Sequence, residues 1–481
     1  MDELWKDHIA GQCVGGNSDP IDVIDPATGL VLAQQAMADA GDVDAAVAAA
    51  RAAHKAGTLP AMRPVERSRF LHAMARYIQD QAGEISTTLT LEQGKPYWEA
   101  RYEVAGAVRF FEYYANLAES LTGQTIPLGA HYIDFTVQEP LGDTTHIIPW
   151  NSPFEMAARS LVPALANGNT CVVKTPELTP LYCAWLTRAA EAADLPEGTV
   201  NVICGHGHIA GAALAGHPDV DLVIFTGSVK TGIAVVDAAA ANIVPTVLEL
   251  GGKSAAIVYD DADLTLLENN IRLGVFYNAG QTCSAMSRLI VHRSVYDKVV
   301  DCAASGAKGL DPVTGIEAAE DGPTIGAMAS LAQRDRAFEM VQQAAKDVAH
   351  LATGSALPDR EGAYIVPTVV TDVSPDMAIA QEEVFGPVLC IIPFDTDEEA
   401  IRLANSTAFG LVGGVYTSNL DRTMTTALKL RGGQIFVNEW FAGGVETPFG
   451  GVGKSGYGRE KGAEALLNYV RTKNIAIRRH T

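Results

Sequence analysis

Two residues able to support covalent catalysis stand 34 positions apart in this chain, Cys283 and Glu249. Cys283 lies in a run of small and polar residues (278–284), and Glu249 lies in an apolar run (246–250). A cysteine thiolate can attack a carbonyl carbon, and the adduct can lose hydride where an acceptor such as a nicotinamide lies beside it. A carboxylate that deprotonates water can then hydrolyse the resulting thioester. One cysteine and one glutamate are therefore enough for such a cycle.

Each residue also has a structural interpretation. A single cysteine in a large chain is most often a small buried apolar side chain, so Cys283 could simply pack. Glu249 could be a surface charge at the end of a strand. Taken singly, neither residue distinguishes catalysis from structure.

Further motifs are distributed along most of the chain. They are Pro149-Trp150-Asn151, 174–180, 225–232, Glu249 with Gly251-Gly252-Lys253, Gln281-Thr282-Cys283, 382–387, and 448–451 leading to Ser455-Gly456. In these motifs and in their order the chain resembles the aldehyde dehydrogenase superfamily, in its NAD(P)-dependent, hydrolytic and non-acylating form. This resemblance favours the catalytic interpretation of Cys283 and Glu249.

The hydrophobic pattern predicts an α/β fold. Helical periodicity covers residues 42–56, 63–93 and 97–118, so the N-terminal part is expected to open mainly helical. Short β-rich runs then alternate with helical stretches, which predicts βαβ units with parallel sheets. The first series of runs is 145–148, 170–174, 200–204, 222–226 and 246–250, and the second includes 255–259, 288–292, 388–394, 411–417 and 434–438.

The resemblance implies a Rossmann-like cofactor domain, a second α/β catalytic domain and a small β arm used for oligomerisation. We expect the NAD-binding domain at 1–120 and 140–250, the catalytic domain at 251–450, and the arm with the C-terminal segment at 121–139 and 451–481. In the family such an arm joins subunits, so a homodimer or homotetramer is expected. An edge hairpin packed within one chain is the alternative.

Composition sets further limits. The chain has 481 residues, 48% of them hydrophobic, which suits a globular protein of more than one domain. Its net charge of −22 disfavours nucleic acid and anionic membranes as partners.

The chain's 7 cysteines form no CxxC pair and no zinc-like cluster with histidine, so we expect no metal. Without a signal-like start or a long apolar run, we expect a reduced cytoplasmic protein.

A glycine-containing loop at 227–232 follows a predicted strand and is expected to open a helix, whose backbone amides can bind a pyrophosphate. Its glycines do not match the usual G-x-G-x-x-G spacing, so a plain turn is the alternative. The resemblance assigns cofactor contacts to Trp150, Lys174, Glu177, Gly227, Ser228, Gly251, Glu383 and Phe385.

Glu177 bears on the choice of cofactor. In the family, Lys174 and Glu177 correspond to residues that bind the adenosine ribose. A carboxylate there accepts hydrogen bonds from ribose hydroxyls and repels a 2′-phosphate, so NAD is favoured over NADP.

The resemblance also assigns the reaction steps. Asn151 and the backbone N–H of Cys283 would form an oxyanion hole, with Cys283 as nucleophile and Glu249 as the base for water. A base at this position argues against the CoA-acylating branch, which tends to lack it. Glu460 resembles an acid on a proton path behind the base, and a helix-surface ion pair is its alternative.

The substrate is expected to be a small aldehyde. The resemblance places Glu155, Arg159, Tyr277, Phe441 and Phe449 along its channel. Arg159 favours an anionic or hydroxylated tail, because a guanidinium can bind a carboxylate through two bonds. An ion pair with Glu155, its i,i+4 neighbour, is the alternative.

The identity of the aldehyde stays open at this point. The family's succinate semialdehyde branch carries a second arginine where this chain has Tyr277, so a semialdehyde acid, a hydroxyaldehyde and an aromatic aldehyde all remain.

Three competing functions are weighed. Gly453-Lys454-Ser455 and Gly252-Lys253-Ser254 resemble the end of an ATP-binding loop, but the first glycine of that loop is missing in both. A CoA-acylating semialdehyde dehydrogenase is a second alternative. A non-catalytic structural protein on the same fold is the third, and the presence of Cys283, Glu249 and Asn151 together argues against it.

Overall fold

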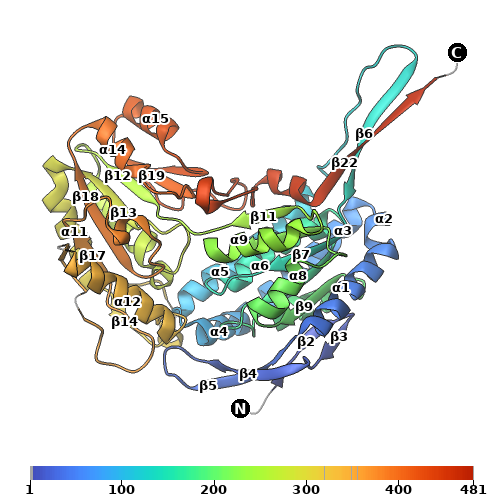
Figure 1. The fold of residues 1–481 in the computed structure, drawn as a ribbon, viewed down its shortest axis with the longest axis horizontal. Coiled ribbons are helices and arrows are strands. Elements are labelled where there is room, and N and C mark those ends of the chain that lie inside the picture. The colour runs from blue at the N-terminus through green and yellow to red at the C-terminus, as the bar shows by residue number, and fades with distance from the viewer. Residues whose placement is uncertain (1–3, 319, 348, 355, 480–481) are drawn as a thin grey trace.

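Two largely parallel sheets form the body of the molecule (Figure 1), and the computed structural model describes residues 4–318, 320–347, 349–354 and 356–479. The first sheet has eight strands in the order β21-β11-β10-β7-β8-β9-β2-β3, of which β11, β10, β7, β8 and β9 run parallel. Its strands are β2 (Asp7–Ile9), β3 (Gln12–Val14), β7 (Asp143–Ile147), β8 (Thr170–Thr175), β9 (Val200–Cys204), β10 (Leu222–Thr226), β11 (Thr246–Glu249) and β21 (Gly456–Tyr457).

Helices cover both faces of this sheet, which is why its central strands are almost continuously apolar. Neighbouring residues of β8 show the alternation: Val172 packs into the core on one face and Val173 into the core on the other. The helices around this sheet are α1 (Ala40–Lys55), α2 (Thr58–Ala61), α3 (Pro64–Asp80), α4 (Ala82–Gln93), α5 (Tyr97–Leu117), α6 (Pro153–Ala166), α7 (Cys183–Ala192), α8 (Ala212–Ala215) and α9 (Val229–Ala240).

The second sheet has seven strands in the order β16-β17-β18-β13-β12-β19-β20, parallel except for β16. Its strands are β12 (Ala255–Val258), β13 (Arg288–His292), β16 (His350–Leu351), β17 (Thr368–Thr371), β18 (Val388–Phe394), β19 (Val412–Tyr416) and β20 (Gln434–Val437). Its helices are α10 (Leu264–Ile271), α11 (Tyr296–Lys308), α12 (Leu331–Lys346), α13 (Ala378–Gln381), α14 (Asp397–Ala404) and α15 (Leu420–Lys429).

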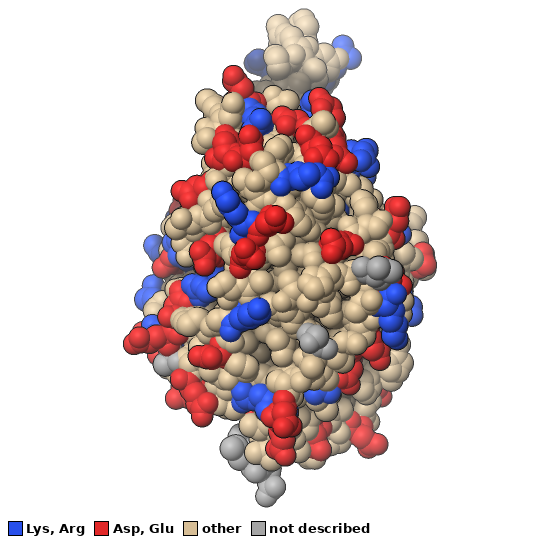
Figure 2. Space-filling view, turned by 90° about the vertical axis from the view of Figure 1, so that its left-hand side faces the viewer, with Lys and Arg blue, Asp and Glu red and all other residues tan. Residues whose placement is uncertain are grey.

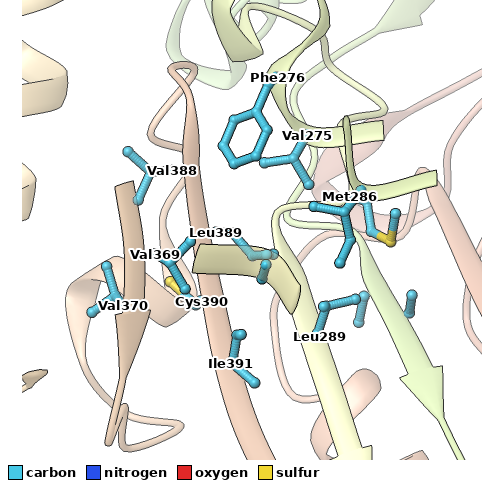
Figure 3. Close-up of a cluster of buried hydrophobic side chains, with 14 of the residues drawn as sticks. Val275, Phe276, Met286, Leu289, Val369, Val370, Val388, Leu389, Cys390 and Ile391 are labelled. Carbon is cyan, nitrogen blue, oxygen red and sulfur yellow. The ribbon is translucent and has the colours of Figure 1, made fainter. Parts of the chain in front are cut away.

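The core of the second sheet also supports the segment that leads to Cys283. Figure 3 shows side chains of β13, β17 and β18 gathered beneath Val275 and Phe276, which are each 2% exposed. Burying a large apolar side chain stabilises its position by about 1.5–3 kcal/mol. Phe276 therefore fixes the chain seven residues before the cysteine.

A two-stranded antiparallel arm projects from the body (Figure 1). It pairs β6 (Tyr132–Pro140) with β22 (Val470–Arg478) along their full length, and Tyr132, Ile133 and Ile477 are exposed on it.

Two regions differ from the helical expectation. Before α1 the chain forms strands rather than helix: besides β2 and β3, a small sheet pairs β1 (Leu4–Trp5), β5 (Val31–Met37) and β4 (Ser18–Ile24). The predicted helix at 63–93 is two helices, because Gln81 leaves helical geometry at φ −99°, ψ 10°.

Surface charges of both signs are interspersed on the face shown in Figure 2. Among the described residues, none of the helices combines the length and the hydrophobicity that a membrane span requires. Within the same residues, no group of three or more His, Cys, Asp or Glu side chains is arranged to hold a metal ion.

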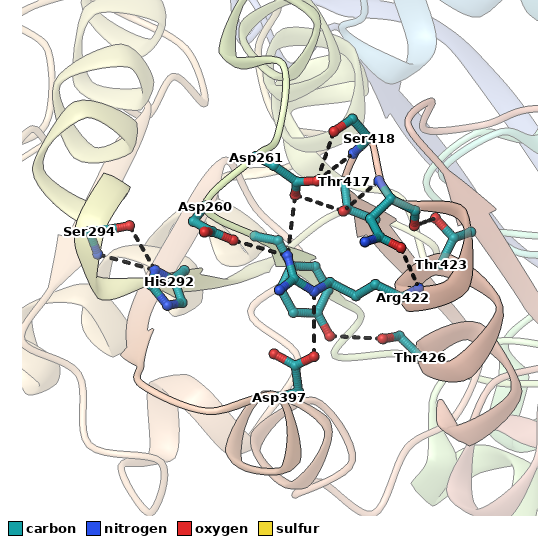
Figure 4. Close-up of polar contacts among 12 residues, drawn as sticks. Asp260, Asp261, His292, Ser294, Asp397, Thr417, Ser418, Arg422, Thr423 and Thr426 are labelled. Atoms are coloured by element: carbon teal, nitrogen blue, oxygen red, sulfur yellow. Dashed lines mark hydrogen bonds and ion pairs between the residues drawn. The ribbon is translucent and has the colours of Figure 1, made fainter.

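Arg422 on α15 ties the second sheet to two of its helices (Figure 4). Its guanidinium lies 3.0 Å from Asp260 and 3.4 Å from Asp397, and it covers the ring of Tyr259 at 4.6 Å. Asp261 lies 3.5 Å from the same group and also accepts hydrogen bonds from Thr417 and Ser418.

We expect Arg422→Met to lower the free energy of unfolding by about 1 kcal/mol, since a charge network exceeds an isolated surface pair. Urea denaturation measures this. Arg402→Met, which removes a single exposed pair with Glu399, is the control and is expected to have a smaller effect. Equal losses in the two variants would contradict a network role.

Candidate functional site

The loop that carries Cys283 is shaped by three consecutive residues in the left-handed region. Asn278, Ala279 and Gly280 have φ of 53°, 50° and 72°. A Cβ on Gly280 would lie 2.2 Å from the carbonyl of Gly386, so only glycine fits there. The turn places Cys283 half-buried at the edge of the second core.

A buried polar cluster ties this loop to the loop of Asn151. Lys95 Nζ lies 2.5 Å from Glu103 and donates to the backbone oxygen of Asn151 at 2.9 Å. Asn278 Nδ2 donates to the same oxygen at 2.7 Å, and Asn151 Nδ2 donates to the backbone oxygen of Gln281 at 2.8 Å. Because these bonds cross between the loops, the amide of Asn151 and the Cys283 segment are held in a fixed relation.

Two more residues of α4 and α5 support the same turn. Glu99 accepts from the backbone N–H of Asn278 at 2.9 Å, and Gln93 Nε2 donates to Asn278 Oδ1 at 2.9 Å. The sequence analysis did not identify this cluster of Gln93, Lys95, Glu99 and Glu103. A signal that could have indicated it is the group of charged residues inside an otherwise apolar helical pattern.

Glu249 ends β11, at the carboxyl edge of the first sheet. It is 2% exposed, and neither carboxyl oxygen has a hydrogen-bond partner among the described residues. Burial raises the pKa of Glu249 well above its usual value, the charge of Glu460 adds to this, and Arg159 opposes it. A Cβ on Gly450 would lie 2.8 Å from Glu249 Oε1, so that glycine leaves room for the carboxyl.

Two cavities meet at Cys283. One has a volume of about 340 Å³ and the other about 430 Å³, and both are lined by Cys283, Asn151 and Met156. Glu249 lines only the smaller cavity. The thiol is therefore accessible from two sides, with the carboxyl on one of them.

Six of the predicted cofactor residues line the smaller cavity. These are Trp150, Gly227, Ser228, Gly251, Glu383 and Phe385. Ser228 caps the N-terminus of α9 by accepting from Thr231 N, so the start of this helix faces the cavity.

Close packing sets the shape of the smaller cavity. Glu383 accepts from Gly252 N at 3.0 Å, and a Cβ on Gly251 would lie 2.2 Å from its carboxyl. The rings of Phe385 and Trp150 meet edge to face at 5.3 Å.

Lys174 and Glu177 lie beyond this lining at the end of β8. Their side chains are 3.2 Å apart, and Glu177 also accepts from the backbone N–H of Gly207 at 2.7 Å. The positive charge of Lys174 lowers the pKa of Glu177 against the opposing effect of burial. Glu177 is therefore an ionised acceptor at the carboxyl edge of the sheet.

The five predicted substrate residues all line the larger cavity: Glu155, Arg159, Tyr277, Phe441 and Phe449. Arg159 is buried and covers the ring of Phe449 at 5.1 Å.

The ion pair of Arg159 is formed with Glu460 rather than Glu155. Glu460 is 2% exposed and lies in a bridge with Phe449, so it is not on a helix surface. Lys461 also lines the larger cavity. It was not among the residues predicted from the sequence, although it directly follows Glu460.

Comparison with known proteins agrees with this geometry. A sequence model described as "Aldehyde dehydrogenase family" matches residues 13–475. The chain belongs to the aldehyde dehydrogenase family.

Three relatives illustrate the similarity. Aldehyde dehydrogenase 1 of Tanacetum cinerariifolium is 40% identical over 94% of this chain and 91% of its own length. A mitochondrial benzaldehyde dehydrogenase of Antirrhinum majus is 40% identical over 94% of this chain and 84% of its own. The solved NAD+ complex of aldehyde dehydrogenase from Bacillus cereus has a TM-score of 0.96 and 38% identity, covering 99% of this chain and 97% of that one.

These findings confirm the predicted family, the α/β fold class and the expectation of an aldehyde dehydrogenase enzyme.

The thiol of the enzyme is protonated at neutral pH in this structure. Burial raises the pKa of Cys283 to about 12, Arg159 counteracts this rise, and the carboxyls of Glu383 and Glu249 add to it. Its thiolate fraction is therefore small near pH 7 and grows about tenfold with each pH unit below the pKa.

We expect alkylation of Cys283 by iodoacetamide to accelerate about tenfold per pH unit from roughly pH 7 to 10, because only the thiolate reacts. Mass spectrometry of the cofactor-free protein measures the rate at this residue. Cys283→Ser gives the background from the exposed Cys13. A rate that levels off near the ordinary thiol pKa of about 8.5 would contradict the raised value.

Proposed function

We propose that this aldehyde dehydrogenase oxidises an aldehyde to a carboxylate with NAD, through a thioester on Cys283 that is hydrolysed by water activated by Glu249. The meeting of two cavities at Cys283 carries this proposal. One cavity suits the cofactor and the other the aldehyde, so both reach the sulfur from different sides. NAD is the cofactor, as the NAD+ complex of the Bacillus cereus relative indicates.

The lining of the smaller cavity fits a dinucleotide. The N-terminus of α9, at Gly227 and Ser228, offers backbone N–H groups for a pyrophosphate. Glu383 offers a carboxylate for ribose hydroxyls, and Phe385 and Trp150 offer aromatic surface. NAD held by these residues would supply the acceptor for the hydride that the aldehyde carbon loses.

The thiolate form of Cys283 would attack the aldehyde carbon, forming a C–S bond and turning the carbonyl oxygen into an alkoxide. The side-chain amide of Asn151 with the N–H of Cys283 would stabilise the charge of this alkoxide. One N–H of the Asn151 amide is used by the oxygen of Gln281, which leaves the second for the alkoxide. A donor of this kind typically contributes roughly 100-fold to 1000-fold in kcat.

Glu249 would then act as the base for water. A carboxyl with a raised pKa is a stronger base than an ordinary glutamate, so it can take a proton from water near neutral pH. Water adds to the thioester carbon, the C–S bond breaks, and the acid leaves as Cys283 is freed.

The remaining proposals concern assembly and location. The exposed apolar residues of the β6–β22 arm support its use in forming a dimer or tetramer. We retain the predicted domain boundaries, and a cytoplasmic location suits the seven free thiols. The cavity lining suits an aromatic, hydroxylated or anionic aldehyde.

The central test is a single-turnover experiment. Glu249→Gln should form about one NADH per site and then slow by roughly 100-fold or more, because the thioester forms but is not hydrolysed. Rapid-mixing absorbance of NADH measures both phases. Cys283→Ala should form no NADH, and Glu464→Gln, on an exposed residue, should turn over like the parent. Full turnover by Glu249→Gln would refute the role of the base.

Cofactor choice gives a second test. Removing the charge in Glu177→Gln should raise the ratio of kcat/KM for NADP to that for NAD by about tenfold, since a carboxylate repels the 2′-phosphate. Initial rates with each cofactor give the ratio, and the exposed Glu84→Gln is the control. An unchanged ratio would remove Glu177 from the ribose site.

A further inference from the structure

Two of the three cationic side chains that line the larger cavity already have an acidic partner. Arg159 pairs with Glu460, and Arg109 lies 2.6 Å from Glu112. Lys461 lines the same cavity, and in the described part of the chain it forms no ion pair or hydrogen bond. Its ammonium is therefore the cation left for a ligand.

The backbone aims Lys461 into the cavity. Lys461 has a φ of 62°, in the left-handed region that side chains other than glycine rarely adopt. Hydrogen bonds hold it from both sides: Glu460 exchanges two with Phe449, and Gly462 donates to Val445 O and accepts from the Tyr114 hydroxyl. A strained conformation kept in this way is typical of a binding position.

Aromatic surface lies beside the ammonium. Lys461 Nζ lies 5.7 Å from the centre of the Phe449 ring, and Phe441 lines the same cavity with a φ of 65°. The thiol of Cys283 also lines this cavity. An aldehyde at the sulfur can thus lay an apolar body on these rings and present its far end to Lys461.

We propose that Lys461 determines substrate specificity by binding a terminal carboxylate of the aldehyde, whose body packs against Phe441 and Phe449. This inference rests on the proposed function and names its substrate class. A carboxylate is favoured because it makes a charge-assisted hydrogen bond with an otherwise unpaired ammonium. The sequence analysis assigned binding of the substrate's far end to Arg159. Because Glu460 already neutralises Arg159, that role is assigned here to Lys461.

Glu155 is the main rival, because a carboxylate in the cavity could instead select a cationic tail. A Cβ on Gly106 would lie 3.0 Å from Glu155 Oε1, so this carboxyl packs against α5. Burial and the nearby Glu103 raise the pKa of Glu155, which favours its neutral form. Because burial disfavours its ionised form, this carboxyl is a weaker receptor for a cation than an exposed glutamate would be.

The test compares three para-substituted benzaldehydes that differ in the terminal group: a carboxylate, its methyl ester and a trimethylammonium. The intact protein should prefer the carboxylate. In Lys461→Met, kcat/KM for the carboxylate should fall at least about tenfold relative to the ester, and Lys461→Arg should retain most of the preference. Lys308→Met, on an exposed residue of α11, is the control.

Binding of an acid that resembles the product tests the role of Lys461 independently of whether the protein oxidises aldehydes. Calorimetric titration with terephthalate and its monomethyl ester needs no turnover, and Lys461→Met should weaken terephthalate binding about tenfold while leaving the ester nearly unchanged. If none of the aldehydes is oxidised, the proposed function fails, but this titration still decides the role of Lys461.

Two outcomes would overturn the inference. One is terephthalate binding that is the same in Lys461→Met as in the parent. The other is a preference for the trimethylammonium aldehyde that Glu155→Gln removes, which would make Glu155 the specificity residue.

Discussion

The buried ion pair between Lys95 and Glu103 holds together parts of the molecule that come from different sheets. Both side chains are almost fully buried, at 0% and 1% exposure. Burying two charges is unfavourable unless their remaining bonding capacity is also used. Here Lys95 also donates to the backbone oxygen of Asn151, and Glu103 also accepts from the backbone N–H of Phe154. The pair therefore fixes the start of α6 and, through Asn278, the loop of Cys283.

The electrostatics of the site follow from the same burial. Loss of solvent is the main cause of the raised pKa of both Cys283 and Glu249. Arg159 lowers both values, and it is itself paired with Glu460. Because Glu460 neutralises Arg159, the guanidinium moderates the pKa of Cys283 and of Glu249 without adding an unpaired positive charge. Burial therefore favours the protonated form of both groups.

The parallel strands could be predicted because burial on both faces selects continuous apolar runs. The run at 170–174 became β8, Thr170–Thr175, and the run at 388–394 became β18 at the same bounds. The N-terminal strands β3 and β4 could not be predicted in this way. Both lie at sheet edges and have few buried residues, so their sequence carries little periodic signal.

The site was only partly predictable for a different reason. Motifs close in sequence identified Cys283, Glu249 and Asn151 because the family resemblance covers them. The supporting residues Lys95 and Glu103 become neighbours of Asn151 only through the packing of α5 against α6, and no local pattern reports such a contact. Long-range polar contacts of this kind need the fold before they can be recognised.

Backbone conformations with positive φ recur around the two cavities that meet at Cys283. Ten non-glycine residues in the described chain have positive φ, and five of them border the two cavities or the loop between them. These five are Asn278, Ala279, Phe385, Phe441 and Lys461. Each such residue costs of order 1 kcal/mol or more, which the surrounding packing must offset.

Concentration of strain at one site is informative because glycine would relieve it. At Phe385, Phe441 and Lys461 the chain retains large side chains in conformations that glycine adopts freely. These side chains face the cavities where the proposed cofactor and substrate would lie. At these positions the backbone is held in a left-handed conformation that orients a side chain toward a cavity. For Lys461 this orientation is one physical basis of the proposed binding role.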